Sequence, residues 1–366
     1  MSKKVIICVG TRPNFIKIIK LKEALTKIGV TSRLLHTGQH FDVNMSSIFF
    51  DQLKLDKPDF ELNITGGDIN LTTGQIIIKS SEVFQSDKPD MVVVVGDVNS
   101  TFACAFAAAS LDIPVAHIES GLRSYRMSMP EERNRILTDN LSSLLFVTEE
   151  IGVKNLLNEG FNDDAIKLVG NTMVDALVEM RPIIDACNLI EDIGVKPKEY
   201  GLCTFHRPIN VDHPDSLALI LKVLRVISER ISLVFPIHPR TRKNIEHFSL
   251  GHLLENTPGV QLIEPQGYIE FIHLIVNAKF LISDSGGVQT EASFLNVPCI
   301  TLRDETELES TISYGTNVLC KLDSKAILAN FDAIMNGKFK AKTDVEIWDG
   351  YATERICEMI HDFLLK

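Results

Sequence analysis

The segment Phe280 to Ala292, F-L-I-S-D-S-G-G-V-Q-T-E-A, holds residues suited to binding an anion. Four apolar residues of a strand lead into Ser285, Gly286 and Gly287, after which apolar residues recur at helical spacing. Free N–H groups at a helix start attract negative charge, and glycine lets an anion approach the main chain. The pattern predicts a phosphate site, although a plain tight turn fits it as well. Glu291, one turn later, is either a solvated helix residue or a carboxylate that holds two sugar hydroxyls.

Three carboxylates in the first half of the chain could transfer protons. Asp97 follows the apolar run M-V-V-V-V-G, where it either serves a site or caps the helix that begins just after it. Glu119 ends another apolar run, and burial there would leave it unpaired unless Arg123 or a ligand pairs with it. Glu131 completes the pattern S-M-P-E of a capping box, which favours a structural role.

Basic residues follow strands in both halves of the chain. His206 and Arg207 end one strand and suggest an anion site, although an ordinary surface histidine fits as well. Arg12 lies in G-T-R-P directly after the first strand, and Lys17 lies one turn into the next helix, where a solvated side chain is the default expectation. Glu307 is expected in a solvated loop. The residues after the second strand allow either role: Gln39, His40 and Asp42.

Apolar strands alternate with helices in both halves, which indicates parallel sheets covered on both faces. We therefore expect an α/β protein of two Rossmann-like, doubly wound domains, 1–170 and 171–349, that face a cleft, with the amphipathic helix 350–366 packing back on the first. Polar residues gather after the strands, where ligands of such sheets bind. The expected strands are 5–9, 32–36, 91–95, 114–118, 144–147, 166–169, 201–205, 232–236, 261–263, 280–283, 299–302 and 316–319.

Composition excludes several classes of function. The 366 residues are 45% hydrophobic and 23% charged, as in a soluble globular protein. A net charge of −11 argues against nucleic acid or an anionic membrane as the partner. No apolar run approaches the ~20 residues of a spanning helix, and we expect a cytoplasmic protein. The seven cysteines form no C-x-x-C pair and there is no H-E-x-x-H, so we expect reduced thiols and no metal.

Nine motifs in this order resemble the non-hydrolysing UDP-N-acetylglucosamine 2-epimerases across nearly the whole chain. The resemblance implies the GT-B fold, two facing Rossmann-like domains, which nucleotide-sugar glycosyltransferases share. The matching segments are G-T-R-P-N-F-I-K at 10–17, T-G-Q-H at 37–40, V-G-D-V-N-S-T at 95–101, H-I-E-S-G-L-R at 117–123, M-P-E-E-R-N-R at 129–135, G-N-T-M-V-D at 170–175, H-R at 206–207, P-I-H-P at 236–239 and S-D-S-G-G-V-Q-T-E at 283–291.

The resemblance implies that the protein interconverts UDP-N-acetylglucosamine and UDP-N-acetylmannosamine. Members of the family eliminate UDP across C1 and C2 of the sugar, which gives a 2-acetamidoglucal, and then add UDP back with protonation on the other face. Carried over to this chain, Asp97, Glu119 and Glu131 are the acid and base carboxylates, and which of them takes the C2 proton stays open. The resemblance implies neither NAD nor a metal, and it implies a homodimer.

The resemblance also implies which residues bind each part of UDP. His206 is implied in catalysis, where it stabilises the leaving UDP. Glu291 would hold the ribose hydroxyls, and Phe271 in P-Q-G-Y-I-E-F would lie on the uracil. The remaining substrate-binding residues that the resemblance implies are Arg12, Lys17, Arg207, Ser285, Gly286 and Gly287.

Two departures from the family pattern affect the expected activity. Pro208 and Ile209 stand where Arg-Glu follows H-R in familiar bacterial members, so we expect altered activation by a second substrate molecule. Leu308 replaces an arginine expected near the nucleotide, which predicts weaker UDP binding or another sugar. The alternatives are an epimerase of a modified sugar such as UDP-2,3-diacetamido-2,3-dideoxyglucuronate, a GT-B glycosyltransferase, or a silent nucleotide-sugar-binding protein. The sequence leaves the sugar and its pathway open.

Overall fold

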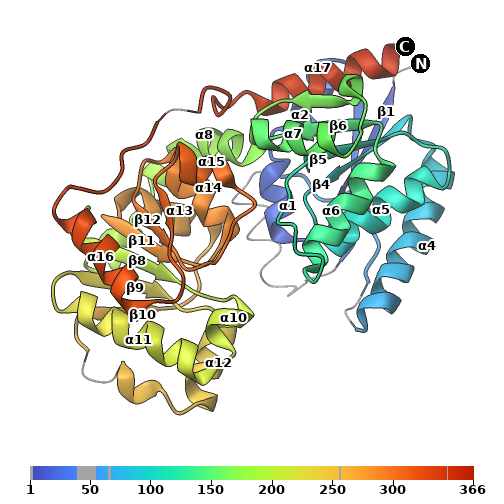
Figure 1. Cartoon of the computed structure of the whole chain (residues 1–366). Coiled ribbons are helices and arrows are strands. Elements are labelled where there is room, and N and C mark those ends of the chain that lie inside the picture. The colour runs from blue at the N-terminus through green and yellow to red at the C-terminus, as the bar shows by residue number, and fades with distance from the viewer. Residues whose placement is uncertain (1–2, 39–54, 65–66, 255–256, 344) are drawn as a thin grey trace. The chain divides into compact units, whose positions relative to one another are not determined.

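The chain folds into two compact α/β units. The computed structural model describes residues 3–38, 55–64, 67–254, 257–343 and 345–366. The N-terminal unit comprises Met1–Glu179 with Glu346–Lys366, and the C-terminal unit comprises Met180–Val345. Each unit is built on one parallel β-sheet with helices packed against it (Figure 1). The expectation of two Rossmann-like, parallel-sheet domains is confirmed.

The sheet of the N-terminal unit has seven strands in the order β3-β2-β1-β4-β5-β6-β7, and every pair is parallel. The runs that were expected to form strands do so, because they are apolar on both faces and helices bury both faces. Only the two-residue β3 was not expected. The strands are β1 Lys4–Val9, β2 Thr31–His36, β3 Phe60–Glu61, β4 Met91–Val95, β5 Val115–Ser120, β6 Leu144–Val147 and β7 Ile166–Leu168.

Small side chains let α5 approach this sheet closely. Ala103, Cys104 and Ala107 are fully buried and belong to one core cluster with Val92 and Val94 of β4. Burial of such apolar surface is the main favourable term in folding. The described helices of this unit are α1 Arg12–Lys17, α2 Leu21–Lys27, α4 Ile69–Asp87, α5 Asn99–Ala109, α6 Pro130–Leu141, α7 Glu150–Asn158, α8 Thr172–Asp185, which continues into the second unit, and α17 Ala352–Leu365.

The sheet of the C-terminal unit has six parallel strands in the order β10-β9-β8-β11-β12-β13. Its core holds fully buried aromatic rings. Phe205 and Phe235 meet edge to face at 5.6 Å between ring centroids, a favourable geometry for aromatic pairs. The strands are β8 Tyr200–Thr204, β9 Ser232–Pro236, β10 Val260–Ile263, β11 Phe280–Ser283, β12 Cys299–Thr301 and β13 Asn317–Leu319.

Helices cover this second sheet as well. Pro182 lies inside α8. No helix in the described part of the chain is long and apolar enough to cross a membrane. The remaining helices are α9 Leu189–Asp192, α10 Pro208–Val211, α11 Pro214–Ser228, α12 Pro239–His247, α13 Tyr268–Asn277, α14 Gly286–Phe294, α15 Glu309–Ser313 and α16 Ser324–Met335.

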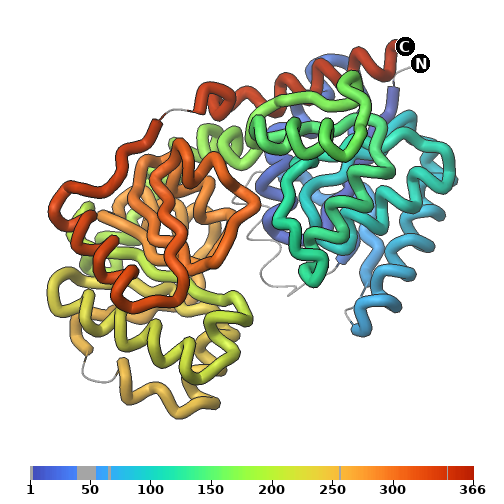
Figure 2. Tube along the Cα trace, viewed as in Figure 1, coloured from blue at the N-terminus to red at the C-terminus, as the bar shows by residue number. Residues whose placement is uncertain are grey.

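The C-terminal helix α17 returns to the first unit and packs along α2 (Figure 2). Its apolar stripe is buried at Ile356 and Ile360. Asp175, 2% exposed, holds the start of this helix. Its carboxylate accepts hydrogen bonds from the backbone N–H groups of Ala352 at 3.2 Å and Thr353 at 2.6 Å, and from the Thr353 hydroxyl at 2.6 Å. The last residue of the G-N-T-M-V-D motif is therefore a helix cap.

We predict that Asp175→Ala lowers the free energy of unfolding by roughly 2 kcal/mol or more, because the variant leaves buried donors without an acceptor. Urea denaturation followed by circular dichroism measures the change. The control is Asp185→Ala on the same helix, which removes an exposed pair with Arg181 and should change stability by about 0.5 kcal/mol or less. Equal effects of the two substitutions would contradict the capping role.

Candidate functional site

The expected site residues follow strands at the switch point of each sheet. β1 lies between β2 and β4, and β8 lies between β9 and β11, so successive connections leave in opposite directions there. Ligands of open parallel sheets bind beyond the carboxyl ends of strands at such points. Arg12 follows β1 and Asp97 follows β4, whereas His206 follows β8 and Ser285 follows β11. We call these regions the N-terminal and the C-terminal half-site.

Asn14 joins the two loops of the N-terminal half-site. Its Oδ1 accepts from the backbone N–H of Thr11 at 3.1 Å and from the Thr11 hydroxyl at 2.9 Å. Its Nδ2 donates to the carbonyl of Val95, the last residue of β4, at 3.0 Å. Arg12 is thereby held as the first residue of α1, half-buried. Sequence reasoning missed Asn14, although its place three residues after a threonine cap was a usable signal.

Lys17 and Glu119 form an ion pair, with 2.5 Å between Nζ and Oε2. The two side chains are only 13% and 16% exposed, so the expectation of a solvated Lys17 is wrong. Arg123 is not the partner of Glu119. It pairs instead with Asp139 and Glu159, each at 2.7 Å. The pairing with Lys17 compensates the carboxylate charge that burial would otherwise make costly.

The backbone around Glu119 is strained. Its φ is +73°, and the register of β5 against β6 shifts between Ile118 and Ser120. A non-glycine residue in this region costs on the order of 1 to 3 kcal/mol, and such strain concentrates at functional sites. Gly96, at φ +71°, faces this group, because a Cβ there would lie 3.4 Å from Lys17 Nζ and 3.9 Å from Glu119 Oε1. The positive φ favours glycine at this position, directly beside the ion pair.

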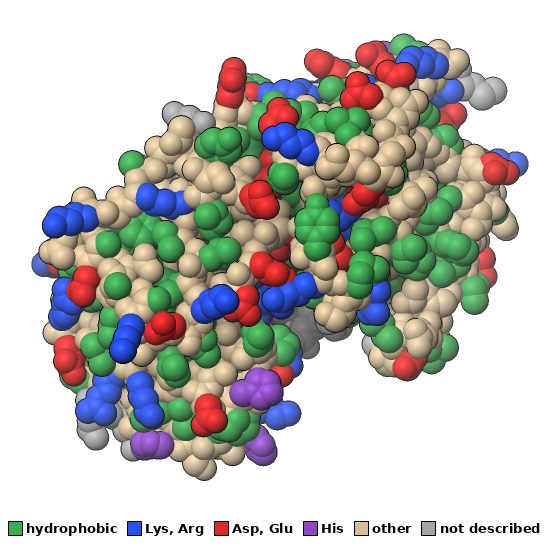
Figure 3. Space-filling model, viewed as in Figure 1, with side chains coloured by type: hydrophobic (Ala, Val, Ile, Leu, Met, Phe, Trp, Pro, Cys, Tyr) green, Lys and Arg blue, Asp and Glu red, His purple; other side chains and the backbone are tan. Residues whose placement is uncertain are grey.

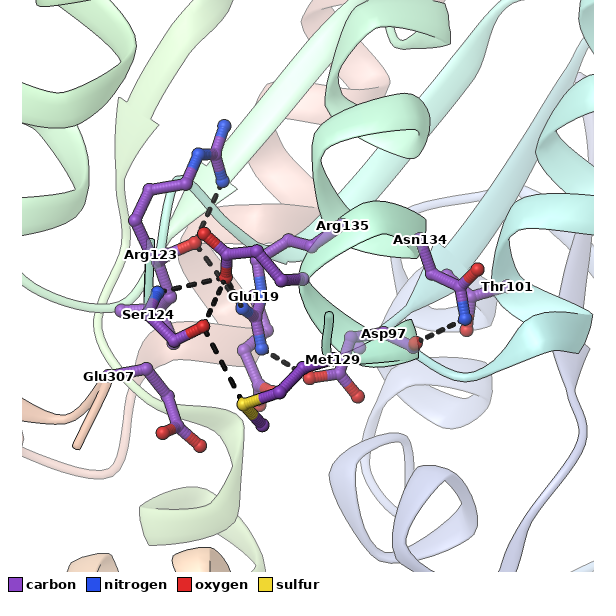
Figure 4. Close-up of polar contacts among 12 residues, drawn as sticks. Asp97, Thr101, Glu119, Arg123, Ser124, Met129, Asn134, Arg135 and Glu307 are labelled. Carbon is purple, nitrogen blue, oxygen red and sulfur yellow. Dashed lines mark hydrogen bonds and ion pairs between the residues drawn. The ribbon is translucent and has the colours of Figure 1, made fainter. Parts of the chain in front are cut away.

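Asp97 is paired with Arg135, whose side chain is 3% exposed (Figure 4). The amide of Asn134 donates to the Asp97 carbonyl at 3.0 Å, so α6 holds both ends of this residue. The helix that follows, α5, has Val98 as its cap residue and no side-chain capping bond. The alternative in which Asp97 caps that helix is therefore wrong.

The two adjacent glutamates of M-P-E-E differ in environment. The cap residue of α6 is Met129 and forms no side-chain capping bond, so the capping box that was expected for Glu131 is wrong. Glu131 is exposed, one position too early for that role. Glu132 is the structural acid. It is 1% exposed and accepts from the backbone N–H groups of Ser124 at 2.8 Å and Tyr125 at 2.9 Å.

One pocket brings Asp97 and Glu131 together. It has a volume of about 370 Å³ and lies at the carboxyl end of β4. Glu119 does not line this pocket. Its carboxylate lies close to Gly96, the residue directly before Asp97. Gln39, His40 and Asp42 lie outside the described residues. The pocket is lined by Thr11, Gly67, Ile69, Thr72, Asp97, Val98, Asn99, Pro130, Glu131 and Asn134.

A buried carboxylate organises the C-terminal half-site. Asp284 is 0% exposed and accepts from the backbone N–H groups of His206 at 3.1 Å and Arg207 at 3.0 Å, and from Asn210 Nδ2 at 3.0 Å. The Arg207 guanidinium returns a hydrogen bond to the Asp284 carbonyl at 2.9 Å. Asp284 thus joins the loop after β8 to the loop after β11. The sequence pattern included this aspartate but indicated no role for it.

His206 is a partly exposed histidine in a cationic setting. Its Nδ1 lies 3.4 Å from Asp284 Oδ1, and its ring lies 5.4 Å from the ring of His238. Burial lowers the pKa of His206; the Asp284 carboxylate opposes this shift, and the positive charges of Arg207 and Arg240 add to it. A neutral imidazole can accept a proton or share one in a hydrogen bond.

The Ser-Gly-Gly turn begins α14, as predicted. Ser285 is the cap residue, Gly286 is the first helical residue and Gly287 is exposed. A Cβ on Gly286 would lie 3.5 Å from Glu307 Oε1 and 3.7 Å from Arg303 Nη1, so glycine keeps this point accessible. Glu307 is not in a solvated loop, because its side chain is 14% exposed and pairs with Arg303 at 2.8 Å. A helix start that has no acidic side chain in its first turn and guanidinium groups nearby can bind phosphate.

Glu291 lies inside the C-terminal unit at 5% exposure, so it is not a solvated helix residue. Burial raises its pKa to about 7. Tyr268 on α13 is 7% exposed, and its hydroxyl lacks a hydrogen-bond partner within the described residues. Burial raises the pKa of Tyr268, and the Glu291 charge adds to this shift. Phe271, half-buried, follows one turn later on α13. The Tyr268 hydroxyl that lacks a partner thus lies on the same helix as Phe271.

The pKa of Glu291 makes a testable prediction about stability. The folded carboxyl, with a pKa of about 7, holds its proton more tightly than the unfolded one, at about 4.3. Stability is therefore lost as pH rises from about 4.3 to 7, by on the order of 3 kcal/mol. Glu291→Gln should unfold at higher urea than wild type at pH 8 and at a similar concentration near pH 4.5. A difference independent of pH, or one also seen with exposed Glu309→Gln, would contradict this.

Comparison with known proteins assigns the chain to a family. The family model described as UDP-N-acetylglucosamine 2-epimerase matches residues 23–361. A UDP-N-acetylglucosamine 2-epimerase of Methanocaldococcus jannaschii is 40% identical over 362 residues, which cover 98% of each chain. A UDP-2,3-diacetamido-2,3-dideoxy-D-glucuronate 2-epimerase of Pseudomonas aeruginosa is 43% identical over 321 residues, 86% of this chain and 88% of the relative.

The fold agrees with this assignment. The crystal structure of the M. jannaschii UDP-GlcNAc 2-epimerase in complex with UDP-GlcNAc and UDP superposes with a TM-score of 0.88 at 39% identity, covering 98% of this chain and 99% of that one. Both the sequence match and the structural match extend through both units. The chain therefore belongs to the UDP-N-acetylglucosamine 2-epimerase family.

Proposed function

We propose that the protein is an isomerase that interconverts UDP-N-acetylglucosamine and UDP-N-acetylmannosamine. This proposal rests on one observation: the half-sites at the two switch points carry different chemical groups. Carboxylates follow the strands of the N-terminal half-site, and a glycine helix start with guanidinium groups follows those of the C-terminal half-site. The similarity to a relative whose structure is described in complex with UDP-GlcNAc and UDP supports the choice of substrate.

The reaction that we propose is an elimination followed by an addition. A carboxylate removes the proton at C2 while the C1–O bond breaks, which releases UDP and leaves a 2-acetamidoglucal. UDP then adds back at C1, and a carboxylic acid protonates C2 from the other face. Asp97, Glu119 and Glu131 are the proposed acids and bases, since general acid–base catalysis needs such groups at the reacting atoms. Lys17 and Arg135 compensate the charge of two of them.

The C-terminal half-site is proposed to hold the nucleotide. The N–H groups of Gly286 and Gly287, with Ser285, Arg207 and His206, would bind the diphosphate and stabilise its charge as it departs. Glu291 would accept the ribose hydroxyls and Phe271 would contact the uracil. Arg12 completes the proposed phosphate contacts. In this assignment the domain 1–170 handles the proton and the domain 171–349 binds UDP.

A modified sugar is the second candidate substrate. The P. aeruginosa relative named for UDP-2,3-diacetamido-2,3-dideoxy-D-glucuronate is 43% identical, similar to the relatives named for UDP-N-acetylglucosamine. The elimination step would be the same for either sugar, because both carry an acetamido group at C2. A direct comparison of kcat/KM for the two substrates separates the candidates.

We also propose a homodimer in the cytoplasm. Apolar side chains gather over α4 and α5 on the face drawn in Figure 3. Leu71 and Ile78, two turns apart on α4, are each 61% exposed, and Phe106 on α5 is 42% exposed. Apolar patches of this kind are typical of interfaces between proteins. We call these three residues the apolar face.

The function test uses UDP-N-acetylglucosamine alone in deuterated water. NMR should show a UDP-N-acetylmannosamine product and deuterium at C2 in both epimers. Asp97→Asn, Glu119→Gln and Glu131→Gln should each lower kcat by about 100-fold or more, because each removes a proposed proton carrier. Glu150→Gln, an exposed acid at the start of α7, is the control and should keep full activity.

Other outcomes would identify the rival functions. Inertness until a sugar acceptor is added would indicate a glycosyltransferase. Accumulation of free UDP with free N-acetylmannosamine would indicate a hydrolysing enzyme. Tight UDP binding without any turnover would indicate a binding protein. Each of these results would contradict the proposed isomerase.

The proposed dimer predicts that a charge placed in the apolar face will halve the mass of the protein in solution. Wild-type protein should run at twice the chain mass in size-exclusion chromatography with light scattering. Ile78→Asp should shift it to the monomer, since it places a charge in the apolar face. Leu365→Asp, an exposed apolar residue on α17, should leave the dimer intact. A wild-type monomer, or a dimer in both variants, would refute this interface.

A further inference from the structure

Arg303 is a buried arginine with an unused donor. It is 8% exposed, and its Nη2 donates to Glu307 Oε2 at 2.8 Å. Its Nη1 is buried and has no hydrogen-bond partner within the described residues. Buried polar atoms nearly always have a partner, and a guanidinium nitrogen can only donate. The missing partner is therefore expected to be an acceptor that is not part of the described chain.

The fold places Arg303 beside the start of α14. It follows β12, which pairs with β11 in the sheet. Asn210 Nδ2 donates to Asp284 at 3.0 Å and to the carbonyl of Leu302 at 3.1 Å, which ties the Arg303 loop to the Asp284 loop. A Cβ built on Gly286 would lie 3.7 Å from Arg303 Nη1. The unused nitrogen thus lies next to the first residue of the helix.

Several positive groups meet at this point. Arg207 Nη2 lies 3.9 Å from the same Gly286 position, and the N–H groups of the first turn of α14 have no partner within the helix. Glu307, 3.5 Å from that position, holds one side of the Arg303 guanidinium and so fixes its plane. A planar guanidinium that is already oriented suits a phosphate oxygen well.

We propose that Arg303 is a diphosphate-binding residue, with Nη1 donating to a phosphate oxygen of UDP at the start of α14. This inference rests on the proposed function and adds a leaving-group contact to it. Leu308 stands where the resembling family carries an arginine, and Arg303 supplies positive charge on the same loop. By holding the diphosphate, Arg303 stabilises the negative charge that develops when the C1–O bond breaks.

The test compares UDP with uridine. Calorimetric titration of the full-length protein should show that Arg303→Gln raises the Kd of UDP about tenfold or more, because a charged hydrogen bond is lost, and leaves the Kd of uridine unchanged. The Kd of UDP for Arg303→Lys should lie between those of wild type and Arg303→Gln, because lysine keeps the positive charge but lacks the planar pair of guanidinium donors. The control Arg230→Gln removes the same charge from an exposed pair with Asp332 and should bind UDP as wild type does.

Three results would overturn the inference. Unchanged UDP affinity in Arg303→Gln, with UDP bound by wild type, would remove the role of Arg303 and leave the proposed function standing. An equal loss of UDP and uridine affinity would indicate that Arg303 only supports the fold. A wild-type protein that binds no UDP would overturn the proposed function together with the inference. Thermal melting checks each variant, and Arg303→Lys carries the test if Arg303→Gln does not fold.

Discussion

The architecture depends on one geometric constraint, the parallel direction of neighbouring strands. Because all strands of a sheet point the same way, every connection that leaves a carboxyl end emerges on the same edge. Loops that are far apart in the sequence therefore become neighbours. The turn after β4 meets the loop after β1 through Asn14, and the turn after β11 meets the loop after β8 through Asp284. The same arrangement, formed twice, builds both half-sites.

The N-terminal half-site shows how acidic groups are kept in a half-buried environment. Each of two proposed acids has a cation from another element, Lys17 for Glu119 and Arg135 for Asp97. Without these partners, burial of the carboxylates would be costly. The positive φ of Glu119 is a second cost, and the surrounding contacts maintain it. Glu131 differs because it is exposed and lines the same pocket as Asp97.

The C-terminal half-site has the opposite character. Its buried carboxylate, Asp284, accepts hydrogen bonds from backbone N–H groups of the protein. The N–H groups at the start of α14 can therefore bind an anion. Two guanidinium groups, those of Arg207 and Arg303, lie near that helix start. A reaction that removes a proton and expels a diphosphate needs both characters. Acids take the proton, and oriented positive groups hold the leaving group.

The sequence by itself determined the strands, the glycine helix start and the family, because these depend on local patterns of apolar residues and on ordered motifs. It also identified Asp97 and Glu119 as acids at strand ends. Only the tertiary structure decided their partners, and it showed that Glu132, not Glu131, has the structural role, as the acceptor for the backbone N–H groups of Ser124 and Tyr125. Asp284 and Arg303 gained meaning only from residues distant in the sequence. The physical reason is that the energy of a buried charge depends on its spatial neighbours, and a linear pattern does not contain those distances.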